Sequence, residues 1–191
     1  MTMWFTSDLH LGHANIIRYC NRPFTDVDAM DAAIIDAIND RVAPDDVLWI
    51  LGDVAMRSRY VPLVAEIRCP CRLVMGNHDT AKPAVYVELF EQVLAEDDLH
   101  GVPGHDDLIA MSHYPATDDG YGRAPAWLDR WNTGRWLLHG HTHGRWRQRG
   151  RWIDVGVDAW GGRPASMDEV QALIAAGPVE FLDPLPWDGA S

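Results

Sequence analysis

Cysteine is scarce in this chain: the 191 residues include only Cys20, Cys69 and Cys71. An odd number with a tight Cys-Pro-Cys does not build a disulfide framework, and a structural zinc site needs a second ligand pair. We therefore expect reduced cysteines that flank a strand. The chain also has no apolar run of the roughly 20 residues that cross a bilayer, and no basic segment followed by an apolar one at its start. These absences favour a cytoplasmic protein that has no membrane partner.

Positive charge is sparse as well. The chain has 16 lysines and arginines against 28 aspartates and glutamates, which gives a formal net charge of −12. Long nucleic acids are disfavoured as partners, because their affinity comes largely from contacts between phosphates and Lys or Arg side chains. A small phosphate-bearing substrate stays compatible with this charge if bound divalent cations supply positive charge locally.

The length and the hydrophobic content of 47% predict a single soluble domain over residues 1–191. Up to residue 113, apolar runs of strand length alternate with helical patterns, which predicts an α/β layered fold with partly parallel pairing. The strands are expected at 3–8, 46–53, 71–79 and 107–113, and the helices at 25–46, 59–69 and 84–93.

The last third of the chain has a different pattern. Short strands are expected around residues 135–140, 144–152 and 151–157, with a hairpin turn at Arg149-Gly150. Ser166 and Glu169 have the spacing of a capping box at the start of a helix. The segment 114–134 is rich in Gly, Pro and Asp, and it is either a lid over a site or a plain surface connection.

Potential metal ligands follow five of the apolar runs. In open α/β sheets, ligands bind outside the carboxyl ends of the strands, so these side chains are expected to meet. Their mixture of oxygen and nitrogen donors suits Mn, Fe(II), Zn, Co or Ni, and a shared carboxylate can bridge two ions about 3.5–4 Å apart. The clusters are Asp8, His10 and His13; Asp53; Asn77, His78 and Asp79; His113; and His141 with His143.

The order Asp-x-His, Gly-Asp, Gly-Asn-His-Asp, His and Gly-His-x-His across residues 8–143 resembles the calcineurin-like metallophosphoesterase superfamily, and in particular its compact bacterial and phage members. The resemblance implies a four-layered α/β/β/α sandwich of two mixed sheets flanked by helices. It also implies two divalent metal ions at the strand ends, with Mn favoured and Fe, Zn, Ni or Co as other options.

Roles of individual residues are likewise implied by the resemblance. Three of them hold one metal, three hold the other, and Asp53 bridges the two ions. His78 contacts the phosphate and assists the leaving group. The first set is Asp8, His10 and His143, and the second is Asn77, His113 and His141.

Several residues allow two interpretations each. His13 and Asn15 could line the substrate pocket or brace a loop, and Arg57 could bind a phosphate or be solvated. Asp79 could orient a ligand or cap a helix. The stretch GDVAMRS lacks the second Asp of the protein-phosphatase pattern Gly-Asp-x-x-Asp-Arg-Gly, which counts against that activity and leaves the partner of His78 open. His139 is expected to be a packing residue.

The function that follows is a dinuclear metal-dependent phosphodiesterase, which hydrolyses small or cyclic nucleotide diesters through a metal-bound hydroxide. Alternatives are a phosphomonoesterase, a nuclease, or a scaffold without catalysis. The nine tryptophans predict core packing or a subunit interface, so a homodimer is an option. Trp127, Trp131 and Trp160 could instead stack on a nucleobase.

Overall fold

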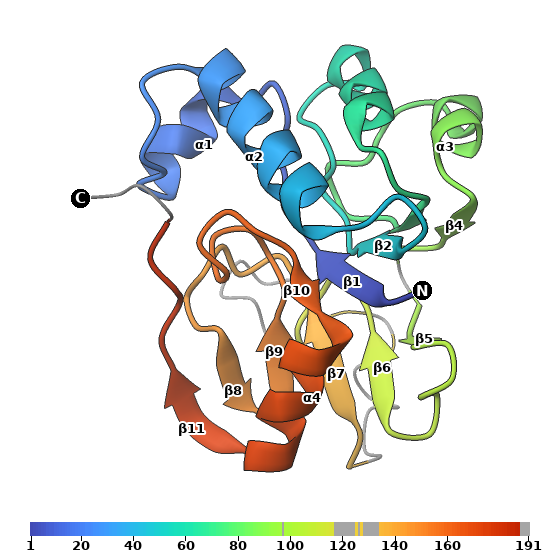
Figure 1. Ribbon diagram of the computed structural model, residues 1–191, viewed down its shortest axis with the longest axis vertical. Helices are drawn as coiled ribbons and strands as arrows, with labels where there is room; N and C mark the ends of the chain where they lie inside the picture. Colours follow the sequence, from blue (N-terminus) through green and yellow to red (C-terminus); the bar gives the residue numbers. More distant parts are fainter. Residues whose placement is uncertain (97, 117–124, 126, 128–133, 188–191) are drawn as a thin grey trace.

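Two mixed β-sheets lie face to face at the centre of the computed structural model (Figure 1), which describes residues 1–187 apart from 97, 117–124, 126 and 128–133. The first sheet has the strand order β10-β1-β2-β3-β4 and the second β11-β8-β9-β7-β6-β5. The first contains β1 (Met3–Thr6), β2 (Val47–Ile50), β3 (Cys71–Val74), β4 (Gln92–Leu94) and β10 (Ala165–Ser166). The second contains β5 (His100–Gly101), β6 (Ile109–Met111), β7 (Trp136–His139), β8 (Gln148–Gly150), β9 (Trp152–Asp154) and β11 (Val179–Leu182).

Both sheets mix parallel and antiparallel pairs. Strands β1 to β4 are parallel to their neighbours, and β10 joins β1 in the antiparallel sense. In the second sheet β6, β7 and β9 are parallel, while β5, β8 and β11 pair antiparallel. The carboxyl ends of β1, β2 and β3 therefore share one edge, as the alternating pattern predicted. The expected fold of two mixed sheets flanked by helices is confirmed.

Side chains along β2 point alternately to its two faces, and each face packs into a different part of the core. Leu48 and Ile50 pack with Ile34 and other residues of α2 on one face, whereas Trp49 packs with Leu138 between the two sheets. Successive strand residues point to opposite faces, so a strand that is buried on both sides is apolar throughout.

The helices are α1 (Ala14–Tyr19), α2 (Val27–Arg41), the 3₁₀-helix η1 (Ser58–Glu66), α3 (Pro83–Leu89) and α4 (Met167–Ala176).

Local sequence explains where these helices begin and end. Asp26 caps α2 by accepting a hydrogen bond from the Ala29 N–H at 2.8 Å. The capping box predicted for α4 is confirmed, because Ser166 and Glu169 each accept a bond from the other's backbone N–H. The helix expected at 59–69 is a 3₁₀-helix with Pro62 inside it, since proline cannot donate an α-helical hydrogen bond.

Two boundary predictions need correction, and one helix was not predicted. The third predicted helix ends at Leu89 and not at Val93, because β4 starts at Gln92 and pairs with β3. The hairpin between β8 and β9 turns at Gly150-Arg151, one residue later than expected, with Gly150 at φ +57°. Helix α1 was not expected at all. Short elements like these are decided by their tertiary partners more than by local pattern.

The remaining expectations have mixed outcomes. All three cysteines are free, and Cys71 is the first residue of β3. Trp127 and Trp160 are buried in the core, whereas Trp131 and most of the 114–134 segment lie outside the described residues. Within the part of the chain that the structure describes, no helix has the length and apolar character needed to span a membrane.

Candidate metal centre

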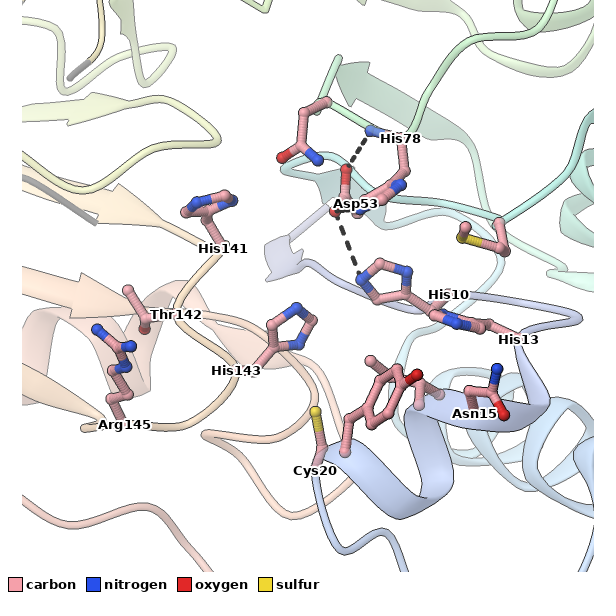
Figure 2. Close-up of a pocket in the computed structure, with 14 residues that line it drawn as sticks. His10, His13, Asn15, Cys20, Asp53, His78, His141, Thr142, His143 and Arg145 are labelled. Atoms are coloured by element: carbon pink, nitrogen blue, oxygen red, sulfur yellow. Dashed lines mark hydrogen bonds and ion pairs between the residues drawn. The ribbon is translucent and has the colours of Figure 1, made fainter. Parts of the chain in front are cut away.

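The ends of the strands meet because backbone hydrogen bonds join the loops that follow them. Asp8 N–H donates to the Gly52 carbonyl at 3.0 Å, and His10 N–H donates to the Asp53 carbonyl at 3.0 Å. Gly140 N–H donates to the His113 carbonyl, also at 3.0 Å, which joins the ends of β6 and β7. These loops border a cavity of about 810 Å³, into which the polar side chains point (Figure 2).

Asp8, His10 and His143 form the first donor set. Each offers one ligand atom, and these atoms all lie within 4.8 Å of one another. His10 is 1% exposed, and neither of its ring nitrogens has a hydrogen-bond partner. Burial, together with nearby His143 and Arg22, holds the pKa of His10 well below its usual range. A buried, neutral imidazole whose nitrogens make no hydrogen bond fits a metal ligand, because only the neutral ring can bind an ion.

Asn77, His113 and His141 form the second donor set. His113 Nε2 lies 3.2 Å from Asn77 Oδ1 and 3.2 Å from His141 Nδ1. His113 Nδ1 is 2.8 Å from the Leu51 carbonyl, which can only accept, so Nδ1 carries the proton. In the neutral ring of His113 the lone pair is therefore on Nε2, the atom that faces the other two donors.

Asp53 lies between the two sets. Its Oδ2 is 3.4 Å from His10 Nε2, and its Oδ1 is 3.6 Å from His113 Nε2. The side chain is 1% exposed. Each carboxylate oxygen thus faces a different donor set, which is the arrangement that a bridging carboxylate needs. The two sets and Asp53 fit a pair of divalent cations.

Each donor set takes residues from both sheets. Asp8 and His10 follow β1 of the first sheet, whereas His143 follows β7 of the second. Asn77 follows β3 of the first sheet, whereas His113 and His141 follow β6 and β7 of the second.

The backbone at these residues is unusual. Six described residues other than glycine have a positive φ, and five of them are predicted ligands. Such φ values are uncommon for non-glycine residues, and they cluster at functional sites, where surrounding structure enforces them. The five ligands are Asp8, His10, Asp53, His141 and His143, with φ between 48° and 69°; the sixth residue is Asn21.

Two glycines of the motifs leave room for the carboxylates. A Cβ on Gly76 would lie 2.4 Å from Asp53 Oδ1, and a Cβ on Gly140 would lie 2.4 Å from Asp8 Oδ2 and 2.0 Å from Ser7 Oγ. These distances are too short for any real Cβ. Glycine therefore precedes Asn77 and His141 because the acidic ligands occupy the space a side chain would take.

His78 lies beside the donor sets and is open to the cavity. Its backbone N–H donates to Asp53 Oδ1 at 2.9 Å, and its Nε2 is 4.0 Å from Asp53 Oδ2. The side chain is 38% exposed and its ring centroid is 5.3 Å from that of His10. In contrast to the buried His10 and His113, His78 is accessible from the cavity.

The residues expected to contact substrate are divided. His13 and Asn15 line the cavity as expected. Other residues that line it carried no such expectation: Ile16, Tyr19, Cys20, Met56, Thr142 and Arg145. Arg57 does not line it; this residue is exposed and precedes η1. His139 is fully buried in β7 with Nδ1 2.8 Å from the Gly140 carbonyl, and burial lowers its pKa to about 4. His139 is therefore a neutral packing residue outside the cavity.

Three further charged residues support the loops. Asp79 accepts hydrogen bonds from the N–H groups of Asp53, Val54 and Gly76 at 2.8–3.0 Å, so it orients a ligand loop and does not cap a helix. Arg22 and Asp158 form a buried ion pair next to His143. Sequence reasoning missed this pair because the two residues are 136 positions apart and neither belongs to a motif.

Comparisons with known proteins agree with this geometry. The model of the calcineurin-like phosphoesterase family matches residues 1–145. The chain is 35% identical to the Gene 66 protein of Mycobacterium phage L5, covering 90% of this chain and 93% of the phage protein. It is 27% identical to the uncharacterized protein MJ1445 of Methanocaldococcus jannaschii, with 93% of each chain covered.

Among solved structures, the protein of unknown function AQ665 from Aquifex aeolicus is similar, with a TM-score of 0.71 and 26% identity. That comparison covers 90% of this chain and 98% of the other. The matched family is one of metal-dependent phosphoester hydrolases with dinuclear centres, which is the kind of centre that Asp53 and the two donor sets fit. The chain belongs to the calcineurin-like phosphoesterase family.

Proposed function

We propose that the protein is a phosphodiesterase that uses two divalent ions, with Mn²⁺ favoured, to hydrolyse small or cyclic nucleotide diesters. The observation that carries this proposal is the position of Asp53 between two converging donor sets at one side of a cavity of about 810 Å³. Cavities of roughly 300–1,000 Å³ hold drug-sized ligands, so this one has room for a nucleotide beside the ions.

Asp8, His10 and His143 would hold one ion, Asn77, His113 and His141 the other, and Asp53 both. When bound, such ions polarise phosphoryl oxygens and lower the pKa of water. The chain supplies the remaining chemistry. His78, open to the cavity, can donate a proton from Nε2 to the oxygen that leaves phosphorus, an effect worth about 10²–10⁴-fold in comparable enzymes.

The charge of the cavity favours a diester over a monoester. Among the described residues that line it, Arg145 is the one with a permanent positive charge, and no lysine joins it. A phosphodiester carries one negative charge, whereas a monoester carries close to two near neutral pH. A cavity with few cationic side chains therefore suits the less charged ester.

Apolar and aromatic residues in the cavity lining favour an organic group next to the phosphate. Helix α1 contributes Ile16 and Tyr19, and the loop after β2 contributes Met56. Tyr19 is 64% exposed and Met56 is 36% exposed. An aromatic ring in this position can stack on a nucleobase, which is worth about 1–3 kcal/mol.

A matrix of metals and substrates tests the proposal. Purified protein is assayed with Mn²⁺, Fe²⁺, Ni²⁺, Zn²⁺ and Mg²⁺ against p-nitrophenyl phosphate, its bis-ester and cyclic nucleotides. We expect hydrolysis with Mn²⁺ and a higher kcat/KM for the diesters. Much faster hydrolysis of the monoester would contradict the diesterase assignment.

Asp53→Asn is the matched variant for this assay. It keeps the shape of the side chain but removes the charge that faces both donor sets, so activity should fall by more than about 100-fold, or about 3 kcal/mol in the barrier. Circular dichroism confirms that the variant is folded. If wild type and a folded variant were equally inactive on every ester, the protein would be a scaffold.

A further inference from the structure

The pair Arg22 and Asp158 lies next to the first donor set but does not line the cavity. Arg22 is 3% exposed and contacts Asp158 twice, Nε to Oδ1 at 2.9 Å and Nη2 to Oδ2 at 2.9 Å. Removing two charges from water is costly, and a buried ion pair is weak evidence of stabilisation by itself. The contacts that each partner makes with the ligand loops indicate what the pair does.

Arg22 holds the loop that follows β1. Its Nη2 donates to the Asp8 carbonyl at 2.8 Å, and its Nη1 donates to the Leu9 carbonyl at 3.0 Å. This is the loop in which Asp8 and His10 adopt φ values of 56° and 51°. The guanidinium group thus donates to two backbone carbonyls where the chain turns into the left-handed region, and it fixes the two ligands on either side of Leu9.

Asp158 holds the third ligand. Its Oδ2 lies 3.3 Å from His143 Nδ1. An imidazole has two nitrogens, so a ring whose Nδ1–H donates to a carboxylate has Nε2 left for a metal. Figure 2 shows the His143 ring between His10 and Cys20, and the centroids of the His10 and His143 rings are 5.0 Å apart.

We propose that Arg22 and Asp158 are positioning residues that set the affinity of the first donor set for its metal ion. The inference rests on the metal centre of the proposed function. One guanidinium group links all three ligands: Asp8 and His10 through the backbone carbonyls between them, and His143 through Asp158. Loss of such an outer partner typically weakens metal binding 10–100-fold. The hydrogen bonds of this pair reach the first donor set directly, whereas the second set is linked to them through Asp8, whose carboxylate accepts from the His141 N–H, so the affinity of the second set should change far less.

A competing metal site would use Cys20, His143 and Asp158, because each of them offers a ligand atom within 4.8 Å of the others. An ion bound there would take Nδ1 of His143. The charge of Arg22, already in contact with both Asp158 oxygens, repels a cation at that position. The identity of the metal-bound nitrogen of His143 therefore separates the two arrangements.

The nitrogen is identified by NMR of the full-length protein labelled with ¹⁵N-histidine and loaded with Zn²⁺. A long-range ¹H–¹⁵N correlation distinguishes a protonated nitrogen from a metal-bound one, and His143→Gln assigns the signal. We expect His143 Nδ1 to be protonated and the ¹⁵N chemical shift of its Nε2 to change on metal binding. A metal shift at Nδ1, or a Zn²⁺-induced change that Cys20→Ala abolishes, would overturn the proposal.

Affinity is measured by calorimetric titration with Zn²⁺, which needs no substrate. In Asp158→Asn we expect one of the two ions to bind 10–100-fold more weakly, and the affinity for the other ion to change far less. Asp46→Asn is the matched control: Asp46 is also buried and accepts bonds from Thr2 and Trp4, but it lies at the opposite end of β1. This control should bind both ions normally.

Arg22→Lys provides a second variant if Asp158→Asn does not fold. Lysine keeps the positive charge but cannot make the bidentate contact with Asp158. We therefore expect a smaller loss of affinity for the same ion than in Asp158→Asn. Unchanged affinity in folded variants would overturn the positioning role. A wild-type protein that binds two ions but hydrolyses no ester would overturn the proposed function alone, and one that binds no ion would overturn both.

Discussion

The carboxylate of Asp79 is the hydrogen-bond acceptor for the backbone of Asp53: Asp53 N–H donates to Asp79 Oδ2 at 2.8 Å. In return, Asp53 Oδ1 accepts from the N–H of His78, the residue next to Asp79, at 2.9 Å. The two loops that follow β2 and β3 are thus joined in both directions. This exchange holds the central carboxylate in place through protein contacts alone.

Replacement of Asp79 should therefore be costly. Burial raises its pKa to about 6, so at pH 8 it is ionised and both oxygens accept bonds. In Asp79→Asn one oxygen becomes an NH₂ group that faces backbone N–H donors, and we expect a loss of about 2–3 kcal/mol in urea unfolding at pH 8. Asp26→Asn is the control, because asparagine caps a helix as well as aspartate does. Equal losses in the two variants would contradict the prediction.

Removal of metal ions should lower thermal stability without unfolding the protein. A ligand at 100 times its Kd stabilises the folded state by about 2.7 kcal/mol, which corresponds to roughly 5–11 °C for a chain of this size. Scanning calorimetry with Mn²⁺ and then with a chelator measures the shift. The shift should shrink in Asp53→Asn. A Tm that is the same with and without the chelator would argue against a bound ion.

The substitution Gly140→Ala should damage the first donor set, because the new Cβ would overlap Ser7 Oγ and Asp8 Oδ2. Overpacking of this kind costs about 1–3 kcal/mol, and displacement of Asp8 should lower metal content as well. Gly150→Ala separates the two effects: its φ of +57° is strained for alanine, but no atom lies within 4 Å of the new Cβ. That variant should lose stability and keep its metal. Elemental analysis and urea unfolding measure both quantities.

Tyr19 should select substrates that carry a base. In Tyr19→Ala, KM for thymidine p-nitrophenyl phosphate should rise about 5–10-fold, in line with an aromatic contact of about 1–1.5 kcal/mol. KM for methyl p-nitrophenyl phosphate, which has the same leaving group and no base, should stay unchanged. Tyr19→Phe keeps the ring and should behave as wild type. An equal rise for both esters would mean that Tyr19 does not contact the base.

Asp31 should make stability depend on pH. Burial raises its pKa to about 6, above the ordinary value, although Gly12 N–H donates to its Oδ2 at 2.9 Å. Between about pH 4 and pH 6 the folded protein keeps a proton that the unfolded chain releases, so stability falls as pH rises and then levels off. Asp31→Asn lacks this titration. At pH 4.5 the urea midpoints of variant and wild type should differ little. The midpoint of the variant should then exceed that of wild type increasingly up to about pH 6 and by a constant amount above it. A difference that does not change with pH would contradict the assignment.

The part of the site that could be predicted from sequence consists of residues directly after apolar runs. Asp8, Asp53 and Asn77 follow parallel strands, whose carboxyl ends must share one edge of a sheet, so their meeting was predictable. The resemblance added the division into two sets. The structure brings these residues together as expected.

Other features depend on contacts between distant segments. Arg22 and Asp158 have no periodic pattern, and only the folded chain brings them together. Tyr19 reaches the cavity through α1, which has six residues and too weak a pattern for prediction. Strand β4 has three residues and is stabilised by pairing with β3, whereas the local pattern of this stretch predicts the end of a helix.

The origin of each donor set in both sheets also bears on the order of assembly. Residues 1–94 contain the whole parallel part of the first sheet, yet they supply only Asp8 and His10 to one set and Asn77 to the other. If the two donor sets bind ions as proposed, high-affinity loading would wait during synthesis until the chain has passed His143 and the second sheet has docked. The bound ions would then connect two halves that are far apart in sequence, and separation of these halves would require release of the ions.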